Sequence, residues 1–380
     1  MTDAAPGSWG GSAGGAAAEV RAMVLVDRST LVPQRFPRPR LGADDGLLHV
    51  ELAGICHTDV DIRSGSFASP LPLVMGHEIV GVIEDVGERA ARRWGVRPGD
   101  RVAVEPMAGC GSCRYCVSGD NRFCELAIGY GTSTSCDAAP HLFGAYASSM
   151  YLAPGSLVHR LPAGMSAESG MLCTVAISNG VQWTLARGGA RQGDHVVVQG
   201  VGPIGLCCVA AARVAGASKV VATGLSRDAL GLQLARSFGA DVAVAVDEED
   251  VLDVVVRATS GELADVVVDT TGSPQAVRTS LDLVRRTGTV VSAGVTGKDT
   301  QTPLPLDLLL RKEIRLQGVF SFNSDAVRRA LVLAQSGSFP FEQLITHRFP
   351  LSQAAQALDV VDDTALGDRL KVVLVPTTDE

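Results

Sequence analysis

From about Gly193 onward, the sequence alternates between short, mostly apolar strands and amphipathic helices, and this alternation restricts the fold more than any other feature. Strands that are apolar on both faces are typical of a parallel sheet that helices cover on both sides. The pattern therefore predicts an α/β fold with a doubly wound parallel sheet. The predicted strands are 195–200, 219–223, 264–272 and 289–294, and the predicted helices are 203–216, 228–240 and 274–288.

The chain before this region has a different character. Residues 1–20 are rich in Gly, Ala and Ser with almost nothing to bury, which predicts a disordered tail. Residues 21–176 read as short strands separated by turns that contain Gly and Pro, which predicts a mostly β region. Because 380 residues exceed what one hydrophobic core usually serves, we expect two domains.

Charge and hydropathy narrow the class of protein. The chain has 33 basic and 41 acidic side chains, which argues against a nucleic-acid partner, since that partner needs a clustered basic face. No apolar run is long enough to cross a membrane and the first residues lack a signal-peptide pattern, so we expect a cytoplasmic protein. In that compartment the nine cysteines stay reduced, which favours metal binding over disulfides for a close cluster.

A glycine motif lies between the first predicted strand and the first predicted helix of the α/β region. Gly200, Gly202 and Gly205 form GxGxxG, with Pro203 and Ile204 inside the turn. The glycines permit a tight turn, close approach of the backbone to a pyrophosphate and close packing of the helix, whose N-terminus favours negative charge. The motif alone also occurs in ordinary turns, so its position between strand and helix carries the prediction of a dinucleotide site.

The end of the next strand bears on which dinucleotide binds. An NAD site usually has Asp or Glu there for the ribose hydroxyls, but this chain has Gly224, followed by Ser226 and Arg227. A small residue followed by a hydroxyl and a guanidinium can accept a 2′-phosphate, which a carboxylate would repel. The sequence therefore favours NADP over NAD, although Arg227 is also what a solvated helix start would carry.

Four cysteines lie in one short segment, at Cys110, Cys113, Cys116 and Cys124. Their C-x2-C-x2-C-x7-C spacing lets one loop surround one Zn²⁺ tetrahedrally. An iron–sulfur cluster competes for the first three cysteines, but the ferredoxin run continues as x3-C-P, whereas here the fourth cysteine is more distant and Glu125 follows it. A closed four-thiolate site leaves no position for a substrate, so we expect it to stabilise a loop.

Further residues of the metal-binding types are dispersed along the chain. Cys56 and His57 lie in GICHTD, His77 and Glu78 in GHEIVG, and Cys173 in GMLCTV. Taken singly, each is also what an ordinary buried core position would carry. Taken in order with the four-cysteine loop and GVGPIG, these motifs resemble the zinc-dependent medium-chain alcohol dehydrogenases over essentially everything after the N-terminal tail.

The resemblance implies a domain arrangement. It implies that residues 21–176 and 319–380 form a GroES-like, mostly β catalytic domain that binds zinc, and that residues 177–318 form a Rossmann dinucleotide-binding domain. Members of the family are usually homodimers or homotetramers that pair through the edge of the nucleotide-domain sheet. We therefore expect a homo-oligomer.

The resemblance also implies two zinc ions per chain, one catalytic and one structural. Cys56, His77 and Cys173 match the ligands of the catalytic zinc, whose fourth position stays open for water or a substrate oxygen. Glu78 matches a carboxylate that can approach the metal from behind and assist ligand exchange. Asp59 matches a carboxylate that orients the ligating His77.

A proton relay and further cofactor contacts follow from the same resemblance. Thr58 matches the hydroxyl that hydrogen-bonds the substrate oxygen and passes its proton onward. At the outer end of the relay the liver-type enzymes have a histidine, whereas this chain has Asp61, a weaker base at neutral pH. The implied cofactor contacts outside the glycine turn are His57, Gly294, Val295 and Lys371, and the implied pocket wall is Phe67, Pro106, Met107 and Phe320.

Three functions follow from these observations. The first is a zinc-dependent alcohol dehydrogenase or carbonyl reductase that moves a hydride between NADP and a small alcohol, aldehyde or ketone. The second is an NAD-dependent polyol or cyclitol dehydrogenase of the same family, and the third is a non-catalytic zinc scaffold. The acidic charge balance and the open metal site argue against the third.

Overall fold

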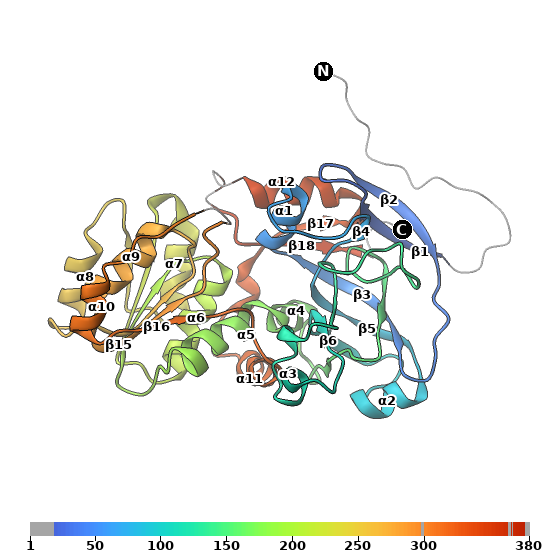
Figure 1. Ribbon diagram of the computed structural model, residues 1–380, viewed down its shortest axis with the longest axis horizontal. Coiled ribbons are helices and arrows are strands. Elements are labelled where there is room, and N and C mark those ends of the chain that lie inside the picture. The colour runs from blue at the N-terminus through green and yellow to red at the C-terminus, as the bar shows by residue number, and fades with distance from the viewer. Residues whose placement is uncertain (1–18, 298–299, 364–365, 367, 377–380) are drawn as a thin grey trace, which may run out of the picture. The chain divides into compact units, whose positions relative to one another are not determined.

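The computed structural model describes residues 19–297, 300–363, 366 and 368–376, and these form two compact units (Figure 1). The first unit contains the described residues of Met1–Thr174, Ile345–Thr364 and Lys371–Glu380, and the second contains those of Val175–Leu344 and Ala365–Leu370.

The second unit extends further along the chain than we expected. We placed the end of the dinucleotide domain at residue 318, but the segment up to Leu344 belongs to the second unit. The reason is that helix α11 (Ser324–Gln335) packs against helix α5 (Ala176–Val181). At its start, the second unit begins two residues before the predicted boundary, at Val175.

The predicted N-terminal tail ends earlier than expected. Residues 1–18 lie outside the described residues, and Glu19 and Val20 already belong to strand β1 (Glu19–Leu25). Val20 is buried because β1 pairs with β2 (Leu31–Pro37) and packs into the core of the first unit.

The sheet of the second unit is parallel throughout, in the order β13-β12-β11-β14-β15-β16. On one face, Val197, Val221 and Val267 pack into a cluster with residues of α8 and α9, whereas α6 also contacts β11 and β12. The α/β fold class is therefore confirmed.

The strands are β11 (His195–Gln199), β12 (Lys219–Gly224), β13 (Val242–Ala245), β14 (Ala264–Asp269), β15 (Val284–Ser292) and β16 (Arg315–Gly318). The helices that alternate with them are α6 (Pro203–Val214), α7 (Ala229–Ser237), α8 (Val251–Ala258), α9 (Pro274–Leu283) and α10 (Leu306–Lys312).

One helix of this unit is shorter than predicted. The predicted helix 274–288 ends before Val284, which begins strand β15 and pairs with the first residue of β14. Lys312 explains the early end, because its Nζ donates at 2.8–3.0 Å to the carbonyl oxygens of Leu281, Asp282 and Val284. These carbonyls would otherwise lack partners at the helix C-terminus. Strand β13 and helix α8 were not predicted.

The first unit is mostly β. Its largest sheet has the order β10-β6-β5-β3-β18-β17, with β9 also paired to β3, and two smaller sheets are β2-β1-β4 and β7-β8. Among the described residues, no helix has the length and apolar character needed to span a membrane. The remaining strands are β3 (Gly46–Ile55), β4 (Leu73–Val74), β5 (Glu78–Val86), β6 (Arg101–Val104), β7 (Met107–Ala108), β8 (Ile128–Gly129), β9 (Ser149–Leu152), β10 (Val158–Arg160), β17 (Ile345–Pro350) and β18 (Lys371–Val375). The helices are α1 (His57–Ser64), α2 (Glu88–Trp94), α3 (Arg114–Val117), α4 (Ala167–Thr174) and α12 (Ala354–Asp362).

The glycine turn after β11 generates a stability prediction. A Cβ on Gly205 would lie 1.9 Å from the Gly200 carbonyl oxygen, whereas a Cβ on Gly202 would meet nothing within 4 Å. We expect Gly205→Ala to lower the free energy of unfolding by about 1–3 kcal/mol, because this clash outweighs the better helix propensity of Ala. Urea unfolding of both variants measures the difference, and Gly202→Ala is the matched control. Equal stability of the two variants would contradict the close packing of Gly205 on the Gly200 carbonyl oxygen.

Candidate active site

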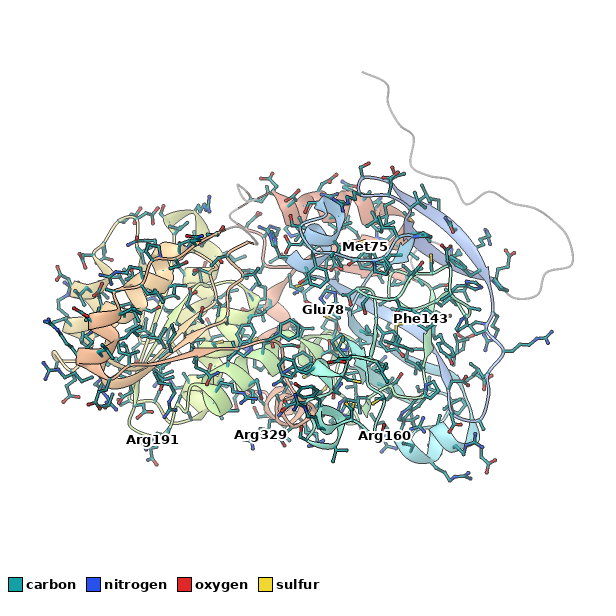
Figure 2. The ribbon with its side chains drawn as sticks, viewed as in Figure 1. Met75, Glu78, Phe143, Arg160, Arg191 and Arg329 are labelled. Atoms are coloured by element: carbon teal, nitrogen blue, oxygen red, sulfur yellow. The ribbon has the colours of Figure 1, made fainter. Side chains whose placement is uncertain are left out.

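Strand pairing in the first unit brings together residues that are distant in sequence. Strands β3 and β5 are antiparallel with Gly54 opposite Glu78, so Cys56, just after β3, lies near His77, just before β5. One potential ligand atom from each of Cys56, His77 and Glu78 lies within 4.8 Å of those of the other two. The three form a candidate metal site, in which Glu78, labelled in Figure 2, is fully buried.

Asp59 joins the two segments that carry these residues. It lies in the first turn of α1, where its Oδ2 accepts a hydrogen bond from the Cys56 backbone N–H at 2.8 Å. Its Oδ1 lies 3.5 Å from Nδ1 of His77, and the carboxylate is fully buried. Asp59 therefore lies where it can fix both the loop of Cys56 and the ring of His77.

The electrostatics of this cluster suit a cation. Burial raises the pKa of the Cys56 thiol, but the hydrogen bond and charge of His77 and the charge of Lys371 together lower it below its ordinary value. Burial opposes the charged form of His77, yet Asp59 and Cys56 hold its pKa well above the ordinary value. Among the described residues, His77 Nδ1, Asp59 Oδ1 and Glu78 Oε2 are buried with no hydrogen-bond partner. His77 Nδ1 and Asp59 Oδ1 face each other at 3.5 Å, and the thiol, imidazole and carboxylate of Cys56, His77 and Glu78 form a donor set that fits a bound divalent metal ion.

Lys371 lies inside this site. Its Nζ donates to Glu78 Oε1 at 2.7 Å and to the carbonyl oxygen of Ile55 at 3.2 Å, and the residue is 5% exposed. Burial opposes its charge, but the Glu78 carboxylate keeps the pKa of Lys371 above its ordinary value. We expected Lys371 to contact a pyrophosphate, whereas its ammonium is engaged by Glu78 and the backbone. Sequence reasoning missed this ion pair because its partners are far apart in the chain.

Cys173 is in a different position from the other expected zinc ligands. It lies on helix α4, which packs on strands β3, β5 and β6, and it is fully buried. Its thiol is not part of the group formed by Cys56, His77 and Glu78, and burial alone raises its pKa far above the ordinary value. The structure thus gathers Glu78 with Cys56 and His77, and the role of Cys173 as a zinc ligand stays a prediction.

The residues of the expected proton relay lie on one helix next to the metal site. Thr58 Oγ1 lies 3.8 Å from Cys56 Sγ at the start of α1. One turn further on, Asp61 Oδ1 lies 4.0 Å from Nε2 of His57, whose side chain is largely exposed. The exposed His57–Asp61 pair and the Thr58 hydroxyl therefore follow one another along the same short helix.

The four-cysteine loop forms a second candidate metal site. The thiols of Cys110, Cys113, Cys116 and Cys124 all lie within 4.8 Å of one another. The Cys113 N–H donates to Cys110 Sγ at 3.3 Å, and the Cys110 N–H donates to Cys124 Sγ at 3.4 Å. Hydrogen bonds from Ser112 and from the Cys113 backbone lower the pKa of Cys110 to about 6. Four convergent thiols, two of which accept backbone N–H bonds, fit a structural zinc ion.

The predicted dinucleotide turn lies at the start of α6 in the second unit. Gly200 has a φ of +102°, which only glycine adopts readily, and its N–H donates to the Thr223 carbonyl oxygen at 2.8 Å. Gly202 caps α6, with Pro203 as the first and Ile204 as the second helical residue. The turn therefore leaves open backbone above a helix N-terminus, which fits a pyrophosphate.

Gly294 and Val295 follow strand β15 in the same unit. The Gly294 N–H donates to the Asp269 carbonyl oxygen at 3.2 Å, and a Cβ on Gly294 would lie 1.9 Å from the Gly272 nitrogen. Val295 is 83% exposed, unlike most of the large apolar residues of this sheet. After β15 the backbone at Gly294 thus packs closely on Gly272, and Val295 presents an uncovered apolar side chain.

The loop after β12 contacts Asp247, a residue that sequence reasoning missed. Gly224 is buried, and a Cβ there would lie 2.6 Å from Val201 Cγ2. Ser226 donates from its backbone N–H to Asp247 Oδ1 at 2.8 Å and from its hydroxyl to Asp247 Oδ2 at 2.6 Å. Asp247 follows the neighbouring strand β13. The sequence analysis looked for a carboxylate at the end of β12, whereas the carboxylate that contacts this loop comes just after β13.

Comparisons with known proteins agree with this arrangement. A model of the alcohol dehydrogenase GroES-like domain matches residues 42–163, and a model described as zinc-binding dehydrogenase matches residues 203–336. A probable alcohol dehydrogenase of Mycobacterium tuberculosis is 42% identical over 86% of this chain and 90% of its own, and a sorbitol dehydrogenase of Bombyx mori is 30% identical over 90% and 96%. A zinc-binding dehydrogenase of Sinorhizobium meliloti, solved with NADP, has a TM-score of 0.84 at 26% identity and covers 94% of this chain and 100% of its own.

The buried ion pair generates a prediction for Lys371. Replacing Lys371 with Met leaves the Glu78 carboxylate buried without its partner, so we expect the free energy of unfolding to fall by about 3–5 kcal/mol. The matched control is Arg92→Met, which breaks an exposed ion pair with Glu88 and should cost at most about 1 kcal/mol. Urea unfolding measures both. The double variant Lys371→Met/Glu78→Gln should recover part of the loss, and a Lys371→Met cost no larger than that of Arg92→Met would contradict the pairing.

Proposed function

Because the chain belongs to the zinc-dependent medium-chain dehydrogenase family, we propose that this alcohol dehydrogenase uses zinc and a nicotinamide cofactor to interconvert an alcohol and its carbonyl compound. The observation that carries the proposal is the cluster of Cys56, His77 and Glu78. It brings a thiol, an imidazole and a carboxylate within 4.8 Å of one another, which is a donor set that zinc binds.

The zinc ion and the nicotinamide would supply the hydride-transfer chemistry, and side chains of the protein would hold the zinc. When bound, zinc polarises the substrate oxygen and the nicotinamide donates or accepts the hydride. Cys56 and His77 would hold the zinc, with Cys173 or Glu78 as the third protein ligand. The family resemblance favours Cys173, whereas Glu78 is the residue that shares the cluster with the other two.

The proton path uses the side chains of helix α1. Thr58 Oγ1 would accept the proton of the substrate alcohol and pass on its own, because it is the hydroxyl beside Cys56. The exposed pair of His57 and Asp61 would receive that proton and exchange it with water. Asp59 lies outside this path, and its role is to orient His77.

The four-cysteine loop would hold a second zinc ion with a structural role. All four of its ligands come from the protein, so no position remains for a substrate. The loss of this ion should open the loop between Cys110 and Cys124 and should leave the chemistry of Cys56 and His77 in place.

The glycine turn supports a nicotinamide dinucleotide as the cofactor. Gly200, Gly202 and Gly205 supply the close backbone approach, and the N-terminus of α6 supplies the positive end of a helix dipole. The absence of a carboxylate at Gly224 and the NADP-bound relative favour NADP. The contact of Ser226 with Asp247 favours NAD, so the NADP preference stays a prediction.

Two further points remain proposals. The sorbitol dehydrogenase and erythritol/L-threitol dehydrogenase relatives favour a polyol dehydrogenase as the second candidate. A homodimer or homotetramer would form through strand β16, which ends the parallel sheet and carries the exposed Leu316. In the described part of the chain, no strand pairs with the outer side of β16.

Zinc content distinguishes two metal sites from one. We expect purified protein to contain about two zinc ions per chain, and the double variant Cys56→Ser/His77→Ala to contain about one. Cys208→Ala, which alters a buried cysteine of α6 outside both clusters, should keep two. Atomic emission measures the content. One ion in the unaltered protein that survives the double change would exclude the catalytic site.

Turnover tests the function and the relay together. A screen of alcohols, polyols, aldehydes and ketones with both nicotinamide cofactors, followed by absorbance of the reduced form, should identify a substrate.

With that substrate, Thr58→Ala should lower kcat by about 100-fold or more because the proton loses its acceptor, whereas Thr58→Ser should stay near the original rate. Zinc content should not change in either variant. An unchanged rate in Thr58→Ala would exclude the relay, and absence of both turnover and cofactor binding would favour a non-catalytic scaffold.

A further inference from the structure

The position that usually recognises the adenosine ribose is a closely packed glycine in this protein. A Cβ on Gly224 would lie 2.6 Å from Val201 Cγ2 and 3.4 Å from Asp228 Oδ2, so a side chain there would require Val201 to shift. The chain thus lacks the carboxylate that an NAD site usually has at the end of this strand. If the protein recognises an unphosphorylated ribose, the negative charge has to come from another element.

Strand β13 supplies such a charge. Because β12 and β13 are parallel with Gly224 beside Ala245, Asp247 follows β13 at the same edge of the sheet as Ser226 follows β12. The Asp247 carboxylate accepts the Ser226 backbone N–H at 2.8 Å and the Ser226 hydroxyl at 2.6 Å. Both donors of Ser226 that a 2′-phosphate would need are therefore already occupied.

The charge balance at this edge also opposes a phosphate. Asp228 lies beside Gly224 and its Oδ2 accepts the Leu225 N–H at 2.9 Å, so two carboxylates flank this short segment. Arg227 is the cation among these residues. A 2′-phosphate would add about two negative charges next to Asp228 and Asp247 and would have to displace Asp247 from Ser226.

We propose that Asp247 is a specificity-determining residue that excludes the 2′-phosphate by occupying Ser226, so that the protein prefers NAD over NADP. The inference rests on the proposed nicotinamide site. It reverses the preference expected from Gly224, Ser226 and Arg227 in the sequence, because the structure commits Ser226 to a carboxylate. Hydrogen bonds from Ser226 also lower the pKa of Asp247, so the carboxylate is charged at neutral pH.

Equilibrium binding tests the inference without turnover. Fluorescence titration of the zinc-loaded protein with NADH and with NADPH gives two values of Kd. We expect the unaltered protein to bind NADH more tightly, and Asp247→Asn to lower the ratio of the NADPH Kd to the NADH Kd by about tenfold or more, because it removes the repelling charge. Asp247→Ser, which also removes the charge, should act in the same direction, and it provides a second measurement if the Asn variant folds poorly.

The matched control is Glu249→Gln. It removes one negative charge from the same loop, but Glu249 forms an exposed ion pair with Arg257 instead of contacting Ser226. We expect it to leave the ratio within about twofold of the original, since exposed charges at a distance are screened. Tighter binding of NADPH by the unaltered protein, or equal effects of Asp247→Asn and Glu249→Gln, would overturn the inference while nicotinamide binding itself stands. Binding of neither cofactor would overturn the proposed function as well.

Discussion

The register of three strands in the first unit determines the candidate active site. Gly54 of β3 pairs with Glu78 of β5 on one side, and Ile55 of β3 pairs with Val372 of β18 on the other. This register brings the ends of three distant segments together and places Cys56, His77 and Lys371 around one point. Because side chains alternate between the faces of a sheet, a slip of one residue in either pairing would point Glu78 or Lys371 away from the others.

Close packing at this point leaves the charged groups dependent on one another. A Cβ on Gly54 would lie 2.3 Å from Glu78 Oε2, so the glycine makes room for a buried carboxylate. Glu78 is neutralised in part by Lys371, and Asp59 faces His77 in the same way. Buried charges are costly unless they are paired, and beside these two pairs Cys56 and His77 offer a thiol and an imidazole to a metal ion. Metal binding and folding should therefore support each other in this unit.

Features that depend on neighbours in sequence could be predicted, and features that depend on long-range pairing could not. The four-cysteine loop and the turn at Gly200 lie within single short segments, so their spacing alone predicted their geometry. The parallel sheet also followed from periodicity. The carbonyl oxygens at the end of helix α9 accept hydrogen bonds from Lys312, and Ser226 contacts Asp247 of the adjacent strand's loop. In both cases the two partners are distant in sequence, so the sequence did not predict that they meet. The family resemblance placed Cys173 by its surroundings, and its role as a zinc ligand stays a prediction.

Anomalous X-ray scattering at the zinc absorption edge, measured on crystals of the purified protein, tests the central claim most directly. The account predicts two zinc peaks in the first unit of each chain. One peak should lie among Cys110, Cys113, Cys116 and Cys124, and the other should lie in contact with Cys56 and His77 and have a coordination position open to solvent. A single peak at the four cysteines, with Cys56 and His77 free of metal in zinc-replete crystals, would contradict the account.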